Sequence, residues 1–157
     1  MITAAQLEII GQLAMALGLG FTIGFERNIA HKTAGMRTFA LVSMGAALFT
    51  IVSRLAFLQF SGSAVDPTRI VAQIVVGIGF LAGGVIIFNH RQVQGLTTSA
   101  GLWVSGGIGM AVGFGLYLVA GAATFLTLFI LVALSFIERR VVGEADEDRS
   151  SHENVKS

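Results

Sequence analysis

Five long apolar stretches succeed one another along the chain, separated by short polar or glycine-containing segments. They cover roughly residues 7–25, 38–57, 70–88, 96–114 and 116–137. Because a helix of about 20 apolar residues crosses the hydrocarbon core of a bilayer, each stretch is long enough to span it. The pattern predicts an all-α polytopic membrane protein, a bundle of about five transmembrane helices. Only residues 113–115 separate the last two stretches, which favours a tight antiparallel hairpin over a single broken or re-entrant segment.

The composition agrees with a chain that is embedded in lipid. Hydrophobic residues make up 54% of the 157 positions and charged residues only 12%, values too apolar for a soluble domain of this size. We therefore expect one transmembrane domain over residues 1–140. With Glu8 and no basic residue near its start, the chain is expected to begin in a permanent span and not in a cleaved signal peptide. The absence of cysteine excludes disulfides, thiolate metal sites and cysteine nucleophiles.

Basic residues are distributed unevenly over the predicted loops. Eight of the ten lysines and arginines fall in the first loop, the third loop and the C-terminal segment, whereas only Arg54 and Arg69 flank the second loop. The cytoplasmic loops of membrane proteins carry the excess of Lys and Arg. With five spans, this distribution predicts an N-terminus outside and a C-terminus in the cytoplasm.

The composition changes beyond residue 140. Residues 141–157 contain the acidic cluster Glu144, Asp146, Glu147 and Asp148 without regular apolar spacing. Such a segment buries too little apolar surface to fold by itself. It is expected to be a disordered cytoplasmic tail, with a metal-sensing role as the weaker alternative.

Small residues recur four positions apart in three of the stretches, a spacing that lets two helix backbones approach closely in lipid. The pairs are Gly20 with Gly24, Gly79 with Gly83, and Gly109 with Gly113. We expect these glycines at helix packing contacts, mainly within one subunit, and homodimerisation through one pair is a further hypothesis. The glycine density of the third and fourth stretches favours tight packing, with a partly unwound helix that lines a substrate path as the alternative.

Charged residues around the first predicted loop form one candidate functional group. Glu26 and Arg27 end the first stretch, and Arg37 precedes the second. Charges near hydrocarbon are costly unless they pair, face inward or lie at the interface. Glu26 is expected to offset one of the two arginines and to fix the turn. The functional alternative is a cytoplasmic gate or a partner-docking site.

A second candidate group lies at the predicted external start of the third stretch. Asp66 before Pro67 is typical of a helix start, and Arg69 and Gln73 share a helix face because they are spaced i,i+4. Capping and packing explain Asp66. The alternative is a polar vestibule or a cation site formed by Asp66 and the amide oxygen of Gln73, a site that the charge of Arg69 opposes.

The sequence lacks the residue patterns of an enzyme active site. No nucleophile, base and orienting group occur together, no histidine pair has zinc-ligand spacing, and no glycine-rich loop follows a strand. His90, between Asn89 and Arg91 in a predicted loop, is interpreted as an exposed residue. We therefore expect a non-enzymatic protein without a cofactor, and the net charge of +1 indicates no nucleic acid partner.

Three ordered segments resemble the signatures of the MgtC/SapB family. The first is GFTIGFERNIAHKTAGMRT, with Gly24, Glu26, Arg27, Ala34, Gly35, Met36, Arg37 and Thr38, and the others are DPTRIVAQIVVGIGFLAGGVII and GLTTSAGLWVSGGIGMAVGFGLY. Together they cover most of residues 20–117. The second departs from the usual Gly-Phe-Leu-Gly-Ala-Gly, because this chain has Gly79-Phe80-Leu81-Ala82-Gly83-Gly84. Some members also carry a cytoplasmic ACT-like domain where this sequence has its short acidic segment, so the role of that domain is not carried over.

The resemblance implies a bacterial inner-membrane protein linked to growth at low magnesium and, in pathogens, to survival inside host cells. By motif position, the functional candidates are Glu26, Arg27, Arg37, Asp66, Arg69 and Gln73. In one hypothesis the chain is a regulator that binds another membrane complex through its helix faces, and the proton-translocating ATP synthase is among the partners proposed for the family. In the other, it is a small oligomeric transporter or channel for magnesium or another cation, with Asp66 as a candidate ligand.

Overall fold

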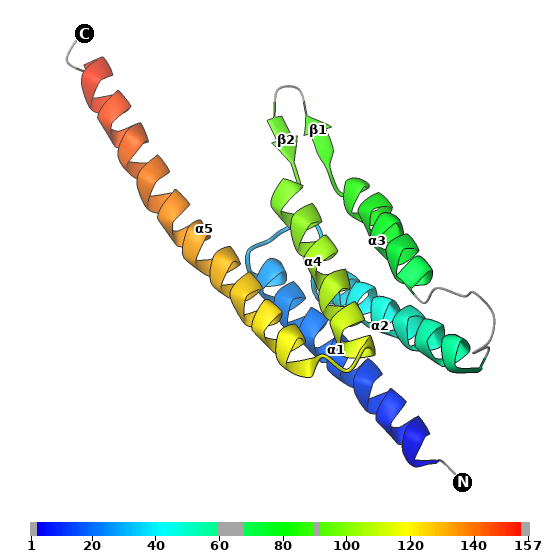
Figure 1. The fold of residues 1–157 in the computed structure, drawn as a ribbon. Coiled ribbons are helices and arrows are strands. Elements are labelled where there is room, and N and C mark those ends of the chain that lie inside the picture. The colour runs from blue at the N-terminus through cyan, green and yellow to red at the C-terminus, as the bar shows by residue number, and fades with distance from the viewer. Residues whose placement is uncertain (1–2, 60–67, 90–91, 155–157) are drawn as a thin grey trace.

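A computed structural model shows an all-α bundle of membrane type, as the sequence predicts. It describes residues 3–59, 68–89 and 92–154, with side chains over residues 3–58, 69–88 and 92–136. The elements, labelled in Figure 1, are α1 (Ala4–Ile29), α2 (Met36–Gln59), α3 (Thr68–Gly83), β1 (Ile87–Asn89), β2 (Gln92–Gln94), α4 (Leu96–Gly113) and α5 (Tyr117–Asn154).

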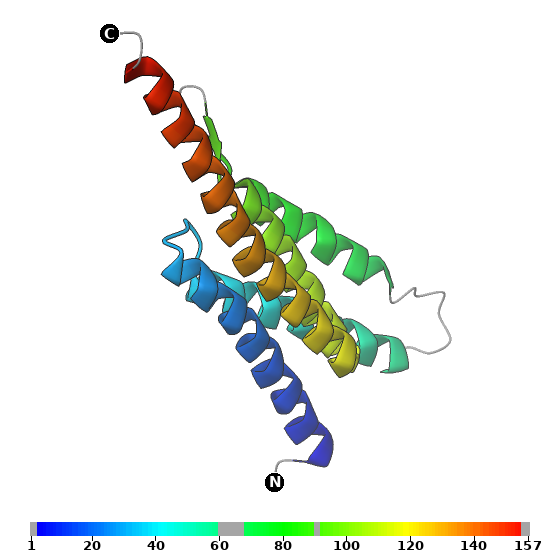
Figure 2. The same ribbon diagram turned by 90° about the vertical axis from the view of Figure 1, so that its left-hand side faces the viewer.

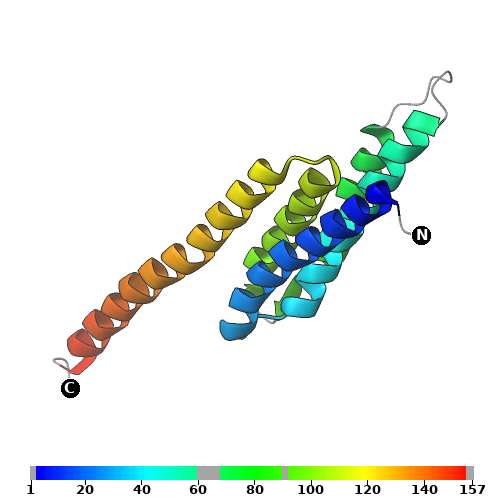
Figure 3. The same cartoon turned by 90° about the horizontal axis from the view of Figure 1, so that it is seen from below.

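The helices differ in length and in how they are held. Helices α1, α2 and α4 pack on one another at the centre, α3 packs on α2 and α4, and α5 packs on α4 and α1. The C-terminal half of α5 runs away from the other helices (Figures 1 and 3). Among the described residues, only α1, residues 36–58 of α2 and residues 117–136 of α5 form helices both long and apolar enough to cross a membrane. With 16 and 18 residues, α3 and α4 are about 24 and 27 Å long.

The third apolar stretch is not helical to residue 88. Helix α3 ends at Gly83, and Ile87–Asn89 pairs antiparallel with Gln92–Gln94, so that Phe88 lies opposite Val93. The glycine pair at residues 83–84 weakens the helix, and the β-branched and aromatic residues that follow favour an extended chain. Gly95 closes this hairpin with a φ of +90°, and a Cβ there would lie 2.3 Å from the Val85 carbonyl oxygen.

The C-terminal segment, for which the sequence predicts a disordered tail, is helical over its described residues. Helix α5 continues to Asn154, and residues 155–157 lie outside the described residues. The physical reason is that residues 117–154 contain no proline and many strong helix formers such as Glu, Ala and Arg. A helix that already exists propagates without the cost of a new nucleus.

Both ends of α1 have regular capping structures. At the start, the Thr3 hydroxyl accepts from the Gln6 amide while the Gln6 side chain accepts from the Thr3 amide. The first turns of α1 extend beyond the turn between α4 and α5 (Figure 2). At the other end, the Lys32 amide donates to the Arg27 carbonyl and the His31 amide to the Asn28 carbonyl, the bonds of a Schellman motif. His31 takes the left-handed conformation of this motif, with a φ of 53°.

Four of the six paired glycines lie where helices approach closely. A Cβ at Gly20 would lie 2.5 Å from the Phe39 carbonyl oxygen, and one at Gly24 would lie 2.7 Å from the Met36 Cα, so both bring α1 onto the start of α2. On the other side of α2, a Cβ at Gly109 would lie 1.9 Å from the Ser43 carbonyl oxygen. One at Gly113 would lie 2.7 Å from the Thr50 Cβ.

Gly79 and Gly83 have different surroundings in spite of the same spacing. A Cβ at either position would meet no described atom within 4 Å. Both glycines line a groove of about 460 Å³ between α3 and α4. Within one chain, therefore, this pair leaves an open surface on the bundle.

Candidate functional site

The Glu26–Arg27 pair lies at the end of α1 on the side of the bundle where α2 begins. The Arg27 Nη2 donates to the Glu26 Oε1 at 2.7 Å, and the Arg27 Nε donates to the Glu26 Oε2. The side chain of Arg27 is 1% exposed and that of Glu26 is 18% exposed. Arg27 lies on the same buried face of α1 as Gly20, Ile23 and Gly24. Its guanidinium therefore points toward the other helices and not toward lipid.

Arg37 and Lys32 lie at the same end of the bundle but remain exposed. Arg37 is in the first turn of α2, and among the described residues the only ion pair is Arg27 with Glu26. Of the two arginines near Glu26, the structure therefore pairs the one that is adjacent in sequence. Lys32 is fixed at its backbone by the Schellman bond to the Arg27 carbonyl.

A groove of about 890 Å³ opens beside this pair, between the end of α1 and the middle of α5. Its walls are mainly apolar and include Phe25, Ile29, Leu128, Val132 and Phe136. Glu26 and Lys32 line its polar end. The site thus joins a charged cluster at one end of α1 to an apolar surface that two helices share.

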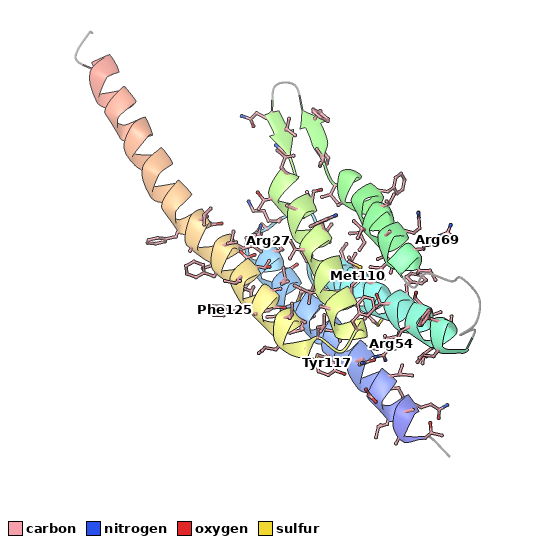
Figure 4. The ribbon with its side chains drawn as sticks, viewed as in Figure 1. Arg27, Arg54, Arg69, Met110, Tyr117 and Phe125 are labelled. Atoms are coloured by element: carbon pink, nitrogen blue, oxygen red, sulfur yellow. The ribbon has the colours of Figure 1, made fainter. Side chains whose placement is uncertain are left out.

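The second predicted group lies at the opposite end of the bundle, as Figure 4 shows for Arg69 and Arg27. Arg69 and Gln73 are both exposed on α3. Gln73 lines an apolar groove of about 520 Å³ between α2 and α3, together with residues such as Phe49 and Ile78. Asp66, like His90 and Arg91, lies outside the described residues. Glu26, Arg27 and Arg37 therefore form one region, and Arg69 and Gln73 another.

Sequence reasoning missed a buried polar contact between α1 and α5. Gln12 is 2% exposed, and its Nε2 donates to the Tyr117 hydroxyl at 2.9 Å. A glutamine within an apolar stretch was a usable signal, because polar groups at membrane depth face the bundle interior and find partners. The contact holds the start of α5 against α1, and Figure 4 shows Tyr117 well away from Arg27.

Small hydroxyl residues make up most of the polar groups at the centre of the bundle. Ser43, Thr50 and Ser105 are fully buried. The Ser105 hydroxyl donates to the Phe39 carbonyl at 3.1 Å, and the Thr50 hydroxyl donates to the Ala46 carbonyl at 2.7 Å. No group of three or more metal-ligating side chains occurs within the described part of the chain.

A bundle with long apolar helices, a closed centre and charged groups near its ends is that of a polytopic membrane protein. The chain belongs to the MgtC family, whose sequence profile matches residues 13–140. The family resemblance of the three sequence segments is thereby confirmed.

Three relatives illustrate the similarity. The chain is 41% identical over 127 residues to the "Putative magnesium transporter YhiD" of Escherichia coli K12, an alignment of 79% of this chain and 59% of that protein. It is 46% identical over 118 residues to the MgtC protein of Brucella abortus strain 2308, covering 75% of this chain and 48% of that one. It is 35% identical over 153 residues to the SapB protein of Bacillus subtilis 168, covering 95% and 64%.

The matched part is shorter than the relatives themselves. The chain spans between 48% and 64% of the length of these three proteins. No solved structure matches the chain.

Proposed function

We propose that this chain is a non-enzymatic regulator in bacterial magnesium homeostasis that acts by binding a membrane partner through its helix faces. The connection to magnesium comes from the name of the Escherichia coli relative. The proposal places the chain in the inner membrane, with its N-terminus outside, its C-terminus in the cytoplasm and no resident cofactor. The start of α1 and the end of α5 lie at opposite ends of the structure (Figure 1), which agrees with an odd number of crossings.

The closed centre of the bundle is the observation that carries this proposal. At Gly109 and Gly113 there is no room even for a methyl group between α4 and α2. Magnesium is bound through oxygen ligands and keeps several of its waters, so a path for it needs a wide polar channel. The buried polar groups at this point, Ser43, Thr50 and Ser105, are single hydroxyls in a packed interior. The centre of one chain therefore fits a packed scaffold better than an ion path.

The groove between α3 and α4 is the surface proposed for the partner. Five of the nine residues that line it are small, Gly79, Ala82, Gly83, Ser99 and Ala100, and small residues allow the backbone of another helix to approach closely in lipid. Trp103, which is 53% exposed, lines the same groove. A second copy of the chain or a subunit of another membrane complex, such as the proton-translocating ATP synthase, would use this surface.

The alternative function is a small oligomeric cation transporter. It is favoured by Gln73, a polar side chain in the apolar groove between α2 and α3, where a path would form only between copies. Magnesium flux distinguishes the two functions. Because the centre of each chain is closed, we expect purified protein in proteoliposomes to give the magnesium flux of empty vesicles. Magnesium flux above that level, if a Gln73→Leu variant lost it, would show that the chain is a transporter and would contradict the regulatory function.

Gly79→Leu is expected to abolish the regulatory function without unfolding the protein. The leucine fills the groove between α3 and α4, where a Cβ meets no described atom within 4 Å, and so it blocks a partner helix. The measurement is growth at low magnesium of a bacterial strain that depends on this chain, together with the amount of protein in the membrane. The matched control is Gly18→Leu on α1, which is also open within 4 Å and should support growth. Normal growth with Gly79→Leu would contradict the assigned surface.

A further inference from the structure

The groove between α1 and α5 has a composition unlike that of the partner groove. Its walls carry large side chains, among them Phe25, Ile29 and Phe136, which keep the backbone of another helix at a distance. Phe25, Ile29 and Phe136 are each at least half exposed within the chain. Along α5 the apolar wall from Leu128 to Phe136 is about 12 Å long. This shape and length fit an acyl chain lying between two diverging helices.

Most of the polar groups in the groove are already satisfied within the protein. The Thr22 hydroxyl donates to the Gly18 carbonyl at 2.8 Å, and the Ser135 hydroxyl donates to the Leu131 carbonyl at 2.6 Å. Both carboxylate oxygens of Glu26 accept from Arg27. The charge of Glu26 is therefore used inside the protein, and it does not call for a cationic ligand.

Among the described residues that line the groove, Lys32 carries the one charge that this pairing leaves without a partner. Its side chain is exposed, and no carboxylate lies within 4 Å of it among the described residues. The Schellman bond to Arg27 fixes its backbone at the end of α1, which is the end of a helix long enough to cross the membrane. A lysine at such a position lies at the level of the lipid headgroups, where anionic lipids attract it.

We propose that the groove between α1 and α5 binds one anionic phospholipid. Its phosphate is held by the Lys32 ammonium, and its acyl chain lies along Phe25, Ile29, Leu128, Val132 and Phe136. The site is separate from the α3–α4 surface, so the lipid-binding proposal does not depend on the proposed regulatory function. The negative headgroup complements the unpaired cation, and the apolar walls require an occupant that is itself apolar.

The test is lipid binding to the purified, delipidated full chain in mild detergent, measured by native mass spectrometry. Phosphatidylglycerol should bind about five-fold more tightly than phosphatidylcholine with the same acyl chains, the preference expected from one lysine at a membrane surface. Lys32→Ala should reduce phosphatidylglycerol to the affinity of phosphatidylcholine. Arg37→Ala removes the same charge at the same end of the bundle, outside the groove, and should keep the preference. An unchanged preference in Lys32→Ala overturns the proposal.

A second variant tests the acyl chain. Val132→Trp adds volume to the wall without touching Lys32, so both lipids should lose binding at this site. If a folded Val132→Trp variant still bound phosphatidylglycerol tightly, the lipid would be held by its phosphate outside the groove. That result would contradict the proposed position of the acyl chain. Chain dimers that exclude lipid would also overturn it, because a second copy would then be the occupant. The exposed Lys32 substitution leaves the packing intact, so it decides the question even if the tryptophan variant does not fold.

Discussion

Gly109→Ala is expected to destabilise the bundle by about 3 kcal/mol, at the upper end of the range for overpacked interiors. The added Cβ would lie 1.9 Å from the Ser43 carbonyl oxygen and 2.7 Å from its carbonyl carbon. These are backbone atoms in the middle of α2, and no side-chain rotation relieves the overlap. Helices α2 and α4 must therefore move apart. This movement also breaks the hydrogen bond from Ser105 to the Phe39 carbonyl, which joins the same two helices. The measurement is unfolding of the purified protein in detergent, by heat or by added SDS.

Gly107→Ala is the matched control, two residues earlier on the same helix. A Cβ at Gly107 meets no described atom within 4 Å, and alanine has the higher helix propensity by about 1 kcal/mol. This variant should be as stable as the wild type or slightly more so. If both substitutions destabilised the protein equally, the close approach of α2 and α4 would not be the reason for a glycine at position 109, and the flexibility of glycine would explain it instead.

The contrast between the glycine pairs also shows how far the sequence predicts the fold. The number and order of the helices follow from apolar stretches, because lipid leaves few alternatives for a long apolar segment. The spacing of Gly79 and Gly83 is the same as that of Gly109 and Gly113, yet only the second pair meets a helix of this chain. Spacing places two residues on one helix face, but it contains no information on which helix, if any, covers that face.

The end of α3 shows a second limit of sequence reasoning. Hydropathy does not separate an apolar helix from an apolar strand, since residues 84–88 are as hydrophobic as the helix before them. The helix ends for a local reason, because Gly83 and Gly84 have low helix propensity. The hairpin that follows depends on the close approach of Gly95 to the Val85 carbonyl. That contact joins residues ten positions apart, and it is decided by the three-dimensional structure.

The sequence predicted the residues of the candidate site, but it did not predict which arginine pairs with Glu26. On a helix, side chains at i and i+1 do not normally face each other, so Glu26 had two arginines within reach on equal terms. In the structure the packing of α1 buries Arg27 to 1% exposure and leaves Arg37 exposed. A buried guanidinium requires a partner far more than an exposed one does, and the Glu26 carboxylate is that partner. Burial, which a single sequence does not display, therefore decides the pair.

Arg27→Met is accordingly expected to destabilise the protein by about 3 kcal/mol, at the lower end of the cost of breaking a buried ion pair because Glu26 keeps 18% exposure. The methionine retains most of the apolar volume, so the loss reports the charge and its two hydrogen bonds to Glu26. Arg37→Met, which removes an exposed arginine, should change the stability by no more than about 0.5 kcal/mol. Unfolding in detergent measures both variants.

A double-mutant cycle with Glu26→Gln separates the pair from the general cost of altering a buried residue. If the carboxylate and guanidinium stabilise each other, the double variant loses less than the sum of the two single variants, by about 1 to 3 kcal/mol. Glu26→Gln alone leaves a buried cation with a neutral partner, so it should also destabilise the protein, although its own side chain is partly exposed. A coupling near zero would mean that Arg27 is stabilised by other groups around it. In that case Glu26 would be free to serve the groove beside it, and Lys32 would no longer be the only charge available there among the described residues that line the groove.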